Sequence, residues 1–166
     1  MTQRIRRRLV ADLTGLPPDA AEPMPLPMRR PVPKDRHALA HLMLDAYRDT
    51  IDYEGETLAD TEGEIARTFV GEYGQFLPQY SFLALDGDDP VSASLVTRYD
   101  GVPFLAFSMT SPRWKGKGLA RHLIRESMLA IREGGETTLA LVVTAGNVPA
   151  ERLYESMGFV EAEGEV

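Results

Sequence analysis

The most informative stretch of the sequence is Thr110-Ser-Pro-Arg-Trp-Lys-Gly-Lys-Gly-Leu-Ala120, which lies between an expected strand and an expected helix. Residues 103–109 before it are apolar enough for a strand, and apolar side chains recur at helical spacing after it. Glycines at the start of a helix let backbone N–H groups approach an anion, which the helix dipole also favours. Cationic side chains add full charges to these partial ones. The stretch therefore predicts a cradle for a phosphorylated ligand. Its expected members are Arg113, Lys115, Gly116, Lys117 and Gly118.

This turn is neither of the two familiar nucleotide-binding loops. Gly118 follows Gly116-Lys117 where a P-loop needs a Ser or Thr hydroxyl for magnesium, and Arg121 stands where a dinucleotide-binding fold needs its third glycine. Two glycines near lysines are common in turns of no function. The strand before the turn and the helix after it favour an anion-binding loop over an ordinary turn, since an anion loop needs that context.

Composition bounds the class of protein. A chain of 166 residues suits one domain with a real core. The absence of cysteine excludes disulfides and thiolate chemistry, and three scattered histidines do not predict a metal site. No apolar run approaches the ~20 residues of a membrane span. We therefore expect a cytoplasmic protein that uses neither a metal nor a membrane.

Charge and proline are unevenly distributed. Residues 1–36 hold eight Lys/Arg and four Asp/Glu, whereas residues 37–166 hold ten and twenty-one. An acidic body argues against a nucleic acid as principal partner. Residues 13–33 contain seven prolines and read as an extended connector. We expect a basic, proline-rich N-terminal extension at 1–27, with a short strand or an arm over 4–13, and one domain at 28–166.

Helices and strands alternate through that domain. Asp35 is placed to cap a first helix, and Thr61-x-x-Glu64 has the form of a capping box for a second. The order predicts an α/β (α+β, three-layer) fold with a mixed, mostly antiparallel sheet and helices on both faces. The further expected elements are strands at 81–86, 91–99 and 103–110, a helix after the turn, a buried strand at 138–143, a helix at 147–157 and a last strand at 159–166.

Two motifs carry a resemblance to a known family. Arg113-Trp-Lys-Gly-Lys-Gly118 is similar to a Gln/Arg-x-x-Gly-x-Gly/Ala pyrophosphate loop. Asn147-Val-Pro-Ala-Glu-Arg-Leu-Tyr-Glu-Ser-Met-Gly-Phe159 is similar to an Asn-x-x-Ala-x-x-x-Tyr-x-x-x-Gly-Phe ending. Both motifs belong to the GNAT superfamily of acyl-CoA-dependent N-acyltransferases, which the chain resembles from about Met28 to Phe159.

The resemblance implies acetyl-CoA as cosubstrate and places it on named residues. Strands 103–110 and 138–143 would splay apart, and the pantetheine arm would bind the backbone near Ser108 and Thr110. The pyrophosphate would lie on the N–H groups of residues 115–120. Tyr154 would protonate the leaving thiolate or hold the sulfur by a hydrogen bond. The alternative is that Tyr154 is only a core aromatic residue on a short helix. The remaining implied contacts are Trp114 against the cofactor, Leu119 and Ala120 in the first helical turn, and Asn147 across the cleft.

The acceptor side is less defined. An alkylammonium has a pKa of about 10.4, so a base should help to remove its proton. Strand 103–110 carries no acid, which leaves Glu54, Glu56 or His41 as candidates. Nine acids between Asp45 and Glu72 could attract a cationic amine, although a solvated helix–loop surface is the more ordinary explanation for them. Glu54 and Glu56 are thus the expected substrate-binding residues.

The leading hypothesis is an N-acetyltransferase that acts on a primary amine of a small molecule or peptide. An acyl-CoA-binding sensor without efficient catalysis is the alternative, and a nucleic-acid binder with a basic arm is a third reading. Dimers are frequent in the family, so a homodimer is one of the open states. The family often has one more strand after the position of Phe159, and residues 4–13 could replace it at an edge of the sheet.

Overall fold

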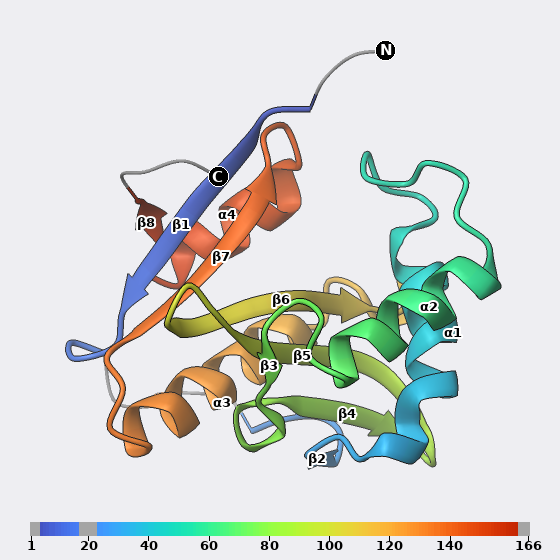
Figure 1. The fold of residues 1–166 in the computed structure, drawn as a ribbon, viewed down its shortest axis with the longest axis horizontal. Coiled ribbons are helices and arrows are strands. Elements are labelled where there is room, and N and C mark those ends of the chain that lie inside the picture. Colours follow the sequence, from blue (N-terminus) through green and yellow to red (C-terminus); the bar gives the residue numbers. More distant parts are fainter. Residues whose placement is uncertain (1–3, 17–22, 163–166) are drawn as a thin grey trace.

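The structure is a computed structural model that describes residues 4–16 and 23–162. These residues form a mixed β-sheet with helices on both faces, which confirms the expected fold class (Figure 1). The strands are β1 (Arg6–Asp12), β2 (Met28–Arg29), β3 (Gln75–Phe76), β4 (Phe82–Asp86), β5 (Asp89–Tyr99), β6 (Val102–Thr110), β7 (Thr138–Thr144) and β8 (Val160–Glu161). The helices are α1 (Arg36–Tyr47), α2 (Leu58–Phe69), α3 (Leu119–Glu133) and α4 (Val148–Ser156), with 3-10 turns at Pro33–Asp35, Pro78–Tyr80 and Pro112–Trp114.

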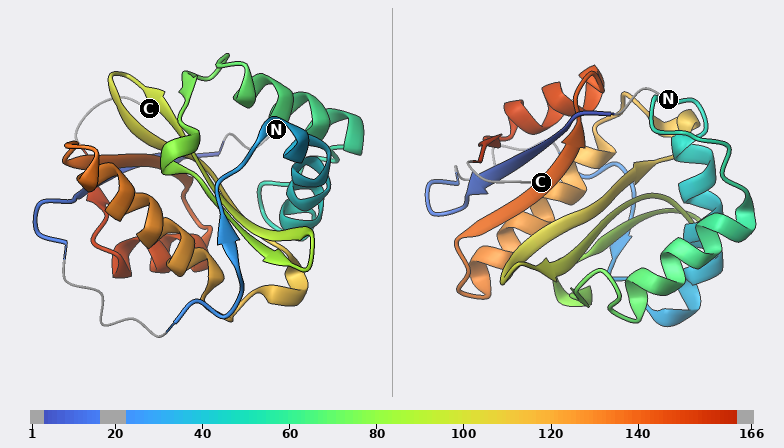
Figure 2. Two further views of the ribbon diagram at one scale, coloured as in Figure 1. Left: turned by 90° about the horizontal axis from the view of Figure 1, so that it is seen from below. Right: turned by 45° about the horizontal axis from the view of Figure 1, so that its top comes forward.

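The sheet divides between β6 and β7. Its strand order is β2-β4-β5-β6-β7-β1-β8, and β3 pairs with β5. The β6–β7 pair is parallel and is registered at Phe104 and Ala140 alone among the described residues, whereas the neighbouring pairs are antiparallel. Beyond that point the two strands diverge, as both views of Figure 2 show. The splay that the resemblance implied is therefore present, and it leaves unpaired backbone facing the gap.

Alternating side chains bury both faces of the sheet. On β4, Leu83 packs beneath α1 and α2, while Phe82 and Ala84 face α3. The period of two along a strand produces this division. The helix after the turn has the expected buried face, with each member at most 1 % exposed. These residues are Leu119, Leu123, Ile124, Met128 and Ile131.

The N-terminal strand lies inside the sheet. β1 pairs antiparallel with β7 along its whole length, from Arg6 opposite Thr144 to Asp12 opposite Thr138, and its other side pairs with β8. Leu9 is fully buried in the core cluster on the α3 side. β1 thus lies next to β7 and is not the edge strand that the sequence suggested. β8 extends only over Val160–Glu161, and the expected continuation beyond residue 162 lies outside the described residues.

One expected helix start differs in the structure, and one expected N-cap residue uses its side chain elsewhere. The second helix begins at Leu58, because Thr57 and Asp60 form the capping box: the Asp60 N–H donates to Thr57 Oγ1 and the Thr57 N–H to Asp60 Oδ2. Thr61 lies inside the helix, where its hydroxyl donates to the Ala40 carbonyl of α1 at 2.9 Å. Asp35 does not cap α1 by its side chain, since its carboxylate accepts from the Val32 N–H and from Arg29. Several residue pairs within a few positions can fit the pattern of a capping box, and the sequence alone does not say which pair begins the helix.

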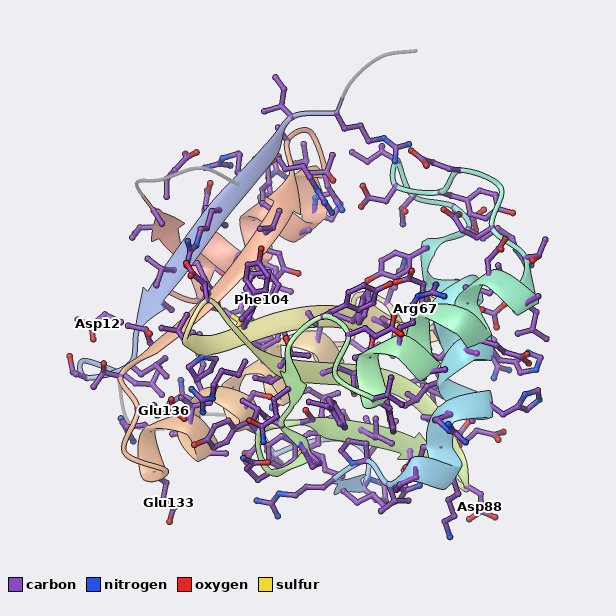
Figure 3. All side chains as sticks on the ribbon, in the orientation of Figure 1. Asp12, Arg67, Asp88, Phe104, Glu133 and Glu136 are labelled. Atoms are coloured by element: carbon purple, nitrogen blue, oxygen red, sulfur yellow. The ribbon has the colours of Figure 1, made fainter. Side chains whose placement is uncertain are left out.

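A charged cluster joins the connection between α3 and β7 to β5. It is centred on Glu136, which Figure 3 labels. Arg98 makes two hydrogen bonds to Glu136, at 2.8 and 2.9 Å, and the Tyr80 hydroxyl donates to the same carboxylate at 2.8 Å. The hydrogen bonds from Arg98 lower the pKa of Glu136 against the opposing effect of burial. A carboxyl with a lowered pKa stabilises the fold above its unfolded pKa, and that contribution is lost as the pH falls through the folded pKa.

We expect Glu136→Gln to lower the free energy of unfolding by about 1–2 kcal/mol at pH 7, because charge-assisted hydrogen bonds are lost. At pH 3 the difference from wild type should shrink, since the unfolded carboxyl titrates near about 4.3. Urea unfolding at the two pH values measures both effects. Glu133→Gln is the control, because Glu133 is exposed and forms none of the described ion pairs. A loss that did not depend on pH would contradict this account.

Candidate active site

The loop between β6 and α3 is shaped by two glycines in the left-handed region. Gly116 has φ +79° and Gly118 has φ +81°, a conformation that L side chains rarely adopt. Gly118 is the N-cap of α3 and makes no side-chain cap. A Cβ on Gly116 would meet no protein atom within 4 Å, so the glycine faces open space. The backbone therefore presents its own polar groups where a side chain would otherwise stand.

These polar groups are donors without acceptors. Among the described residues, no hydrogen-bond acceptor is found for the backbone N–H groups of residues 116–121. The first turn of α3 contains no acidic side chain that could cap them. Unsatisfied N–H groups and the helix dipole together favour an anion at this end of α3. The loop can therefore receive an anionic group, and the resemblance implies that this group is the pyrophosphate of CoA.

The cations of this loop are placed in different ways. Arg113 lies in the 3-10 turn that begins the loop. Lys117 Nζ lies 5.8 Å from the centre of the Trp114 ring, over its face. Lys115 Nζ donates to the Ala46 carbonyl near the end of α1 at 3.2 Å, so its charge joins the loop to that helix. The cationic side chains of residues 113, 115 and 117 thus all belong to the loop that presents the free N–H groups, and Lys115 also ties the loop to α1.

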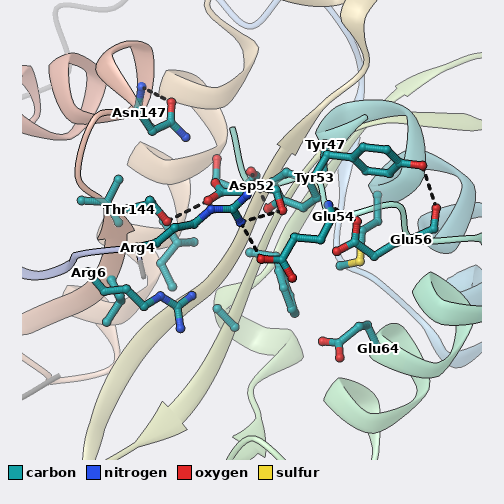
Figure 4. Close-up of a pocket in the computed structure, with 18 of the residues that line it drawn as sticks. Arg4, Arg6, Tyr47, Asp52, Tyr53, Glu54, Glu56, Glu64, Thr144 and Asn147 are labelled. Atoms are coloured by element: carbon teal, nitrogen blue, oxygen red, sulfur yellow. Dashed lines mark hydrogen bonds and ion pairs between the residues drawn. The ribbon is translucent and has the colours of Figure 1, made fainter. Parts of the chain in front are cut away.

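A cavity of about 960 Å³ opens where β6 and β7 separate. Its walls include residues 105–108 of β6 and residues 142–144 of β7, and the connection between α1 and α2 lies over it (Figure 4). Ser108 lines the cavity two residues before β6 ends at Thr110. β6 therefore runs from the cavity directly to the anion loop, which joins the two halves of the site.

Two tyrosines lie against this cavity with their hydroxyls near Ser108. The Tyr47 hydroxyl donates to the Ser108 carbonyl at 3.4 Å. Burial raises the pKa of Tyr154 to about 12; its hydrogen bond with the Ser108 side chain opposes this rise, and the charge of Asp52 adds to it. Burial also raises the pKa of Tyr47. Both phenols therefore hold their protons throughout the neutral range and serve as hydrogen-bond donors.

The other expected cofactor contacts also have structural roles. The Asn147 side chain lines the cavity and accepts from the Ala150 N–H at 3.5 Å, so it caps α4. This cap places Tyr154 two turns further along the same helix. The Thr110 hydroxyl is paired with Ser92 Oγ at 2.9 Å, which leaves its backbone as the part available near the loop.

The acids of the α1–α2 connection differ in what they contact. Glu54 forms an ion pair with Arg4 at 3.1 Å, and the Glu56 carboxylate accepts from the Glu54 N–H. Both line the cavity, whereas His41 is exposed on α1 and is hydrogen-bonded to His37 outside it. Asp52, which sequence reasoning missed, also lines the cavity. Its carboxylate accepts from the Thr144 hydroxyl at 2.7 Å.

The only sequence signal for Asp52 was the excess of acids between residues 45 and 72. That excess does not distinguish the acid that faces inward from those that face solvent. The distinction depends on Thr144, which is 92 positions away in the chain.

A sheet split between two parallel strands, with an anion loop after one strand and a tyrosine-lined cavity at the split, is the arrangement that the resemblance to acyl-CoA-dependent acyltransferases implied. The chain belongs to the acetyltransferase (GNAT) family, whose model matches residues 37–159. This match confirms the family that the two sequence motifs indicated.

Relatives and solved structures agree with this assignment. The chain is 34 % identical over 97 residues to the ribosomal protein bS18-alanine N-acetyltransferase of Salmonella typhimurium, covering 58 % of this chain and 64 % of that enzyme, just under two thirds of its length. A GCN5-related N-acetyltransferase from Sphaerobacter thermophilus superimposes with a TM-score of 0.74 at 21 % identity, over 96 % of this chain and 49 % of that one.

The PaiA N-acetyltransferase of Thermoplasma acidophilum in complex with coenzyme A superimposes with a TM-score of 0.68 at 16 % identity, over 86 % and 94 % of the two chains. At these identities the structural likenesses show the fold. Among the described residues of our chain, no helix has the length and apolar character needed to cross a bilayer, and no group of three or more His, Asp or Glu is placed to hold a metal ion.

Proposed function

We propose that the protein transfers an acetyl group from acetyl-CoA to the primary amine of a small molecule or peptide, by direct attack in a ternary complex. The observation that carries the proposal is the continuity of the site. β6 leads from the cavity at Ser108 to six consecutive N–H groups without acceptors at residues 116–121. A ligand with an anionic end and a narrow arm would bind along this path with its reactive end in the cavity.

The cofactor, when bound, supplies an acyl group activated as a thioester. Arg113 and the loop N–H groups would hold its pyrophosphate, with Trp114, Lys117, Leu119 and Ala120 around them. The unpaired backbone of β6 near Ser108 and Thr110 would hydrogen-bond to its arm, and Asn147 would approach from the end of β7. With these residues holding the cofactor, its acyl end would lie where β6 and β7 separate, and the rest of the cavity would be left to the amine.

Tyr154 would then act by holding the sulfur. Its pKa of about 12 lies above the thiol value of about 8.5. Complete proton transfer from this phenol to a thiolate is therefore uphill. A short hydrogen bond from the phenol to the developing thiolate avoids that cost while it stabilises the negative charge. We therefore assign Tyr154 to sulfur positioning and charge stabilisation.

We expect Tyr154→Phe to lower kcat by about 10- to 100-fold, the effect of losing one hydrogen bond of about 1.5–3 kcal/mol to a charged group. The dissociation constant for CoA should change by less than about twofold, because the phenol contacts only the reacting end. Steady-state kinetics and calorimetric titration measure the two quantities. Tyr99→Phe, on the exposed end of β5, should change neither value. An unchanged kcat in Tyr154→Phe would remove Tyr154 from the mechanism.

The function itself is tested by incubating the protein with acetyl-CoA and a broad panel of amines. Because the sequence has no cysteine, a thiol reagent detects only released CoA, and mass spectrometry identifies the acetylated amine. Transfer to at least one amine supports the proposal. Binding of acetyl-CoA without transfer to any amine would favour the sensor reading, and a melting temperature unchanged by CoA would contradict both.

A further inference from the structure

The cavity between β6 and β7 is lined by charges of both signs. Carboxylates come from the α1–α2 connection and from α2, and guanidinium groups come from the N-terminal segment that enters β1. Figure 4 shows Arg4 reaching to Glu54 and the Asp52 carboxylate bound to Thr144. The carboxylates are those of Asp52, Glu54, Glu56 and Glu64, and the guanidinium groups are those of Arg4 and Arg6.

Most of these charges already have partners in the protein. Arg4 pairs with Glu54 at 3.1 Å and donates to the Asp52 carbonyl at 3.2 Å. Glu64 pairs with Arg67 at 3.0 Å. These contacts satisfy the groups concerned and bind the α1–α2 connection to the wall of the cavity formed by the N-terminal segment. They do not require a charged ligand.

Arg6 differs from the rest of the set. In the described part of the chain, no hydrogen bond or ion pair involves its guanidinium, which points into the cavity in Figure 4. Arg6 is the cross-strand partner of Thr144, so the two side chains leave the same face of the sheet about 5 Å apart at their Cβ atoms. The Thr144 hydroxyl binds the Asp52 carboxylate on that face. A cation and a carboxylate therefore stand at one end of the cavity without pairing with each other.

We propose that this end of the cavity binds a dipolar acceptor, a small molecule that carries both a primary amine and a carboxylate. The inference rests on the proposed acetyl transfer and narrows its substrate to amino acids and short peptides with a free carboxylate. Arg6 binds the carboxylate, because a guanidinium fork matches a carboxylate with two charge-assisted hydrogen bonds. Asp52 attracts the ammonium. The negative charge of Asp52 also acts on the Tyr154 hydroxyl, so the two groups lie in the same part of the cavity.

This assignment separates the roles of the two arginines. Arg4 neutralises Glu54 and holds the α1–α2 connection in place, so the surrounding acids do not present an unscreened negative surface. Among the described carboxylates that line the cavity, Asp52 and Glu56 are in no ion pair, so a dicationic amine would pair with these two and would bring its second charge near Arg6. Repulsion between these like charges disfavours a polyamine, whereas a molecule with one charge of each sign matches the lining.

Matched pairs of acceptors test the inference. The probes are the common amino acids and their C-terminal amides, which differ only in the carboxylate, together with cadaverine as an amine without one. For wild type we expect a measurable preference for acids, expressed as the ratio of kcat/KM values. In Arg6→Gln that acid-to-amide ratio should fall by about 10-fold or more, mostly through KM, as a lost charge-assisted pair of about 1.4 kcal/mol or more predicts. Because both proteins receive the same two amines, differences in intrinsic reactivity cancel.

Arg8→Gln is the matched control. Arg8 lies two residues further along the same face of β1, outside the cavity lining, and its guanidinium is 3.7 Å from Asp100. The acid-to-amide ratio of kcat/KM values for Arg8→Gln should equal that of wild type. Arg6→Lys retains the charge without the fork and should give an intermediate ratio.

A second measurement does not depend on turnover. N-acetylated amino acids carry the carboxylate but no reactive amine, and they should raise the melting temperature of wild type and Arg8→Gln but not of Arg6→Gln. An acid-to-amide ratio that is unchanged by Arg6→Gln, or better transfer to cadaverine than to every amino acid, would overturn the dipolar site and leave acetyl transfer intact. Failure of acetyl-CoA to bind, or of every amine to react, would instead refute the proposed function.

Discussion

Replacing both Gly116 and Gly118 by Val should weaken CoA binding by about 30- to 900-fold. Each glycine has a positive φ near 80°, which costs an L residue about 1–2 kcal/mol and a β-branched residue more. The double variant would have to spend about 2–4 kcal/mol to keep the loop in the conformation that directs its N–H groups outward, and a 100-fold change corresponds to about 2.7 kcal/mol. Calorimetric titration with CoA measures the dissociation constant directly.

The chain offers a control with the same backbone strain. Gly87 and Gly101 lie in the β4–β5 and β5–β6 turns with φ of +63° and +81°, and a Cβ on either would meet no atom within 4 Å. Val at both positions should lower the melting temperature much as Val at the loop positions does, and it should leave CoA affinity unchanged. Equal affinities in the two double variants would mean that CoA does not bind at the loop.

The parts of this molecule that could be predicted from sequence are those carried by contiguous residues. The loop, its strand and its helix occupy residues 102–133 without interruption, so composition and period determine them together. The buried face of α3 and the hairpin at Asp100-Gly101, where both residues have positive φ, follow from the same local rules. The second motif predicted its helix for the same reason, since Asn147 is the N-cap of the short helix that contains Tyr154.

The acceptor half of the cavity followed no such local rule. The lining of this proposed half combines residue 6, residues 52–54 and 56, and residues 142–144, which meet only when β1 pairs with β7 and the α1–α2 connection lies over them. The excess of acids indicated that region, but pairing decides which charge is available to a ligand. Arg4 neutralises Glu54, whereas Arg6 has no such partner in the described chain. Charge counted along a sequence therefore differs from charge presented in a cavity.

Leu9→Asp should unfold the protein or reduce its melting temperature by at least about 15 °C. Leu9 is fully buried on a strand paired on both sides, so Asp would place a charge in the core with no partner. The loss should exceed about 4 kcal/mol, a large part of a typical stability of about 5–15 kcal/mol. Leu9→Ala should cost about 3 kcal/mol through lost burial and a cavity, which keeps the test quantitative if the Asp variant cannot be isolated.

Ile5→Asp provides the comparison, because Ile5 precedes β1 and is 72 % exposed. Its melting temperature should stay within about 2 °C of wild type, as is usual for surface substitutions of under about 0.5 kcal/mol. If Leu9→Ala were equally neutral, β1 would not belong to the folded sheet in solution, and Arg6 would have no fixed place in the cavity. Thermal unfolding of these variants therefore tests both the strand that completes the sheet and the foundation of the acceptor site, since one seven-residue segment supplies both.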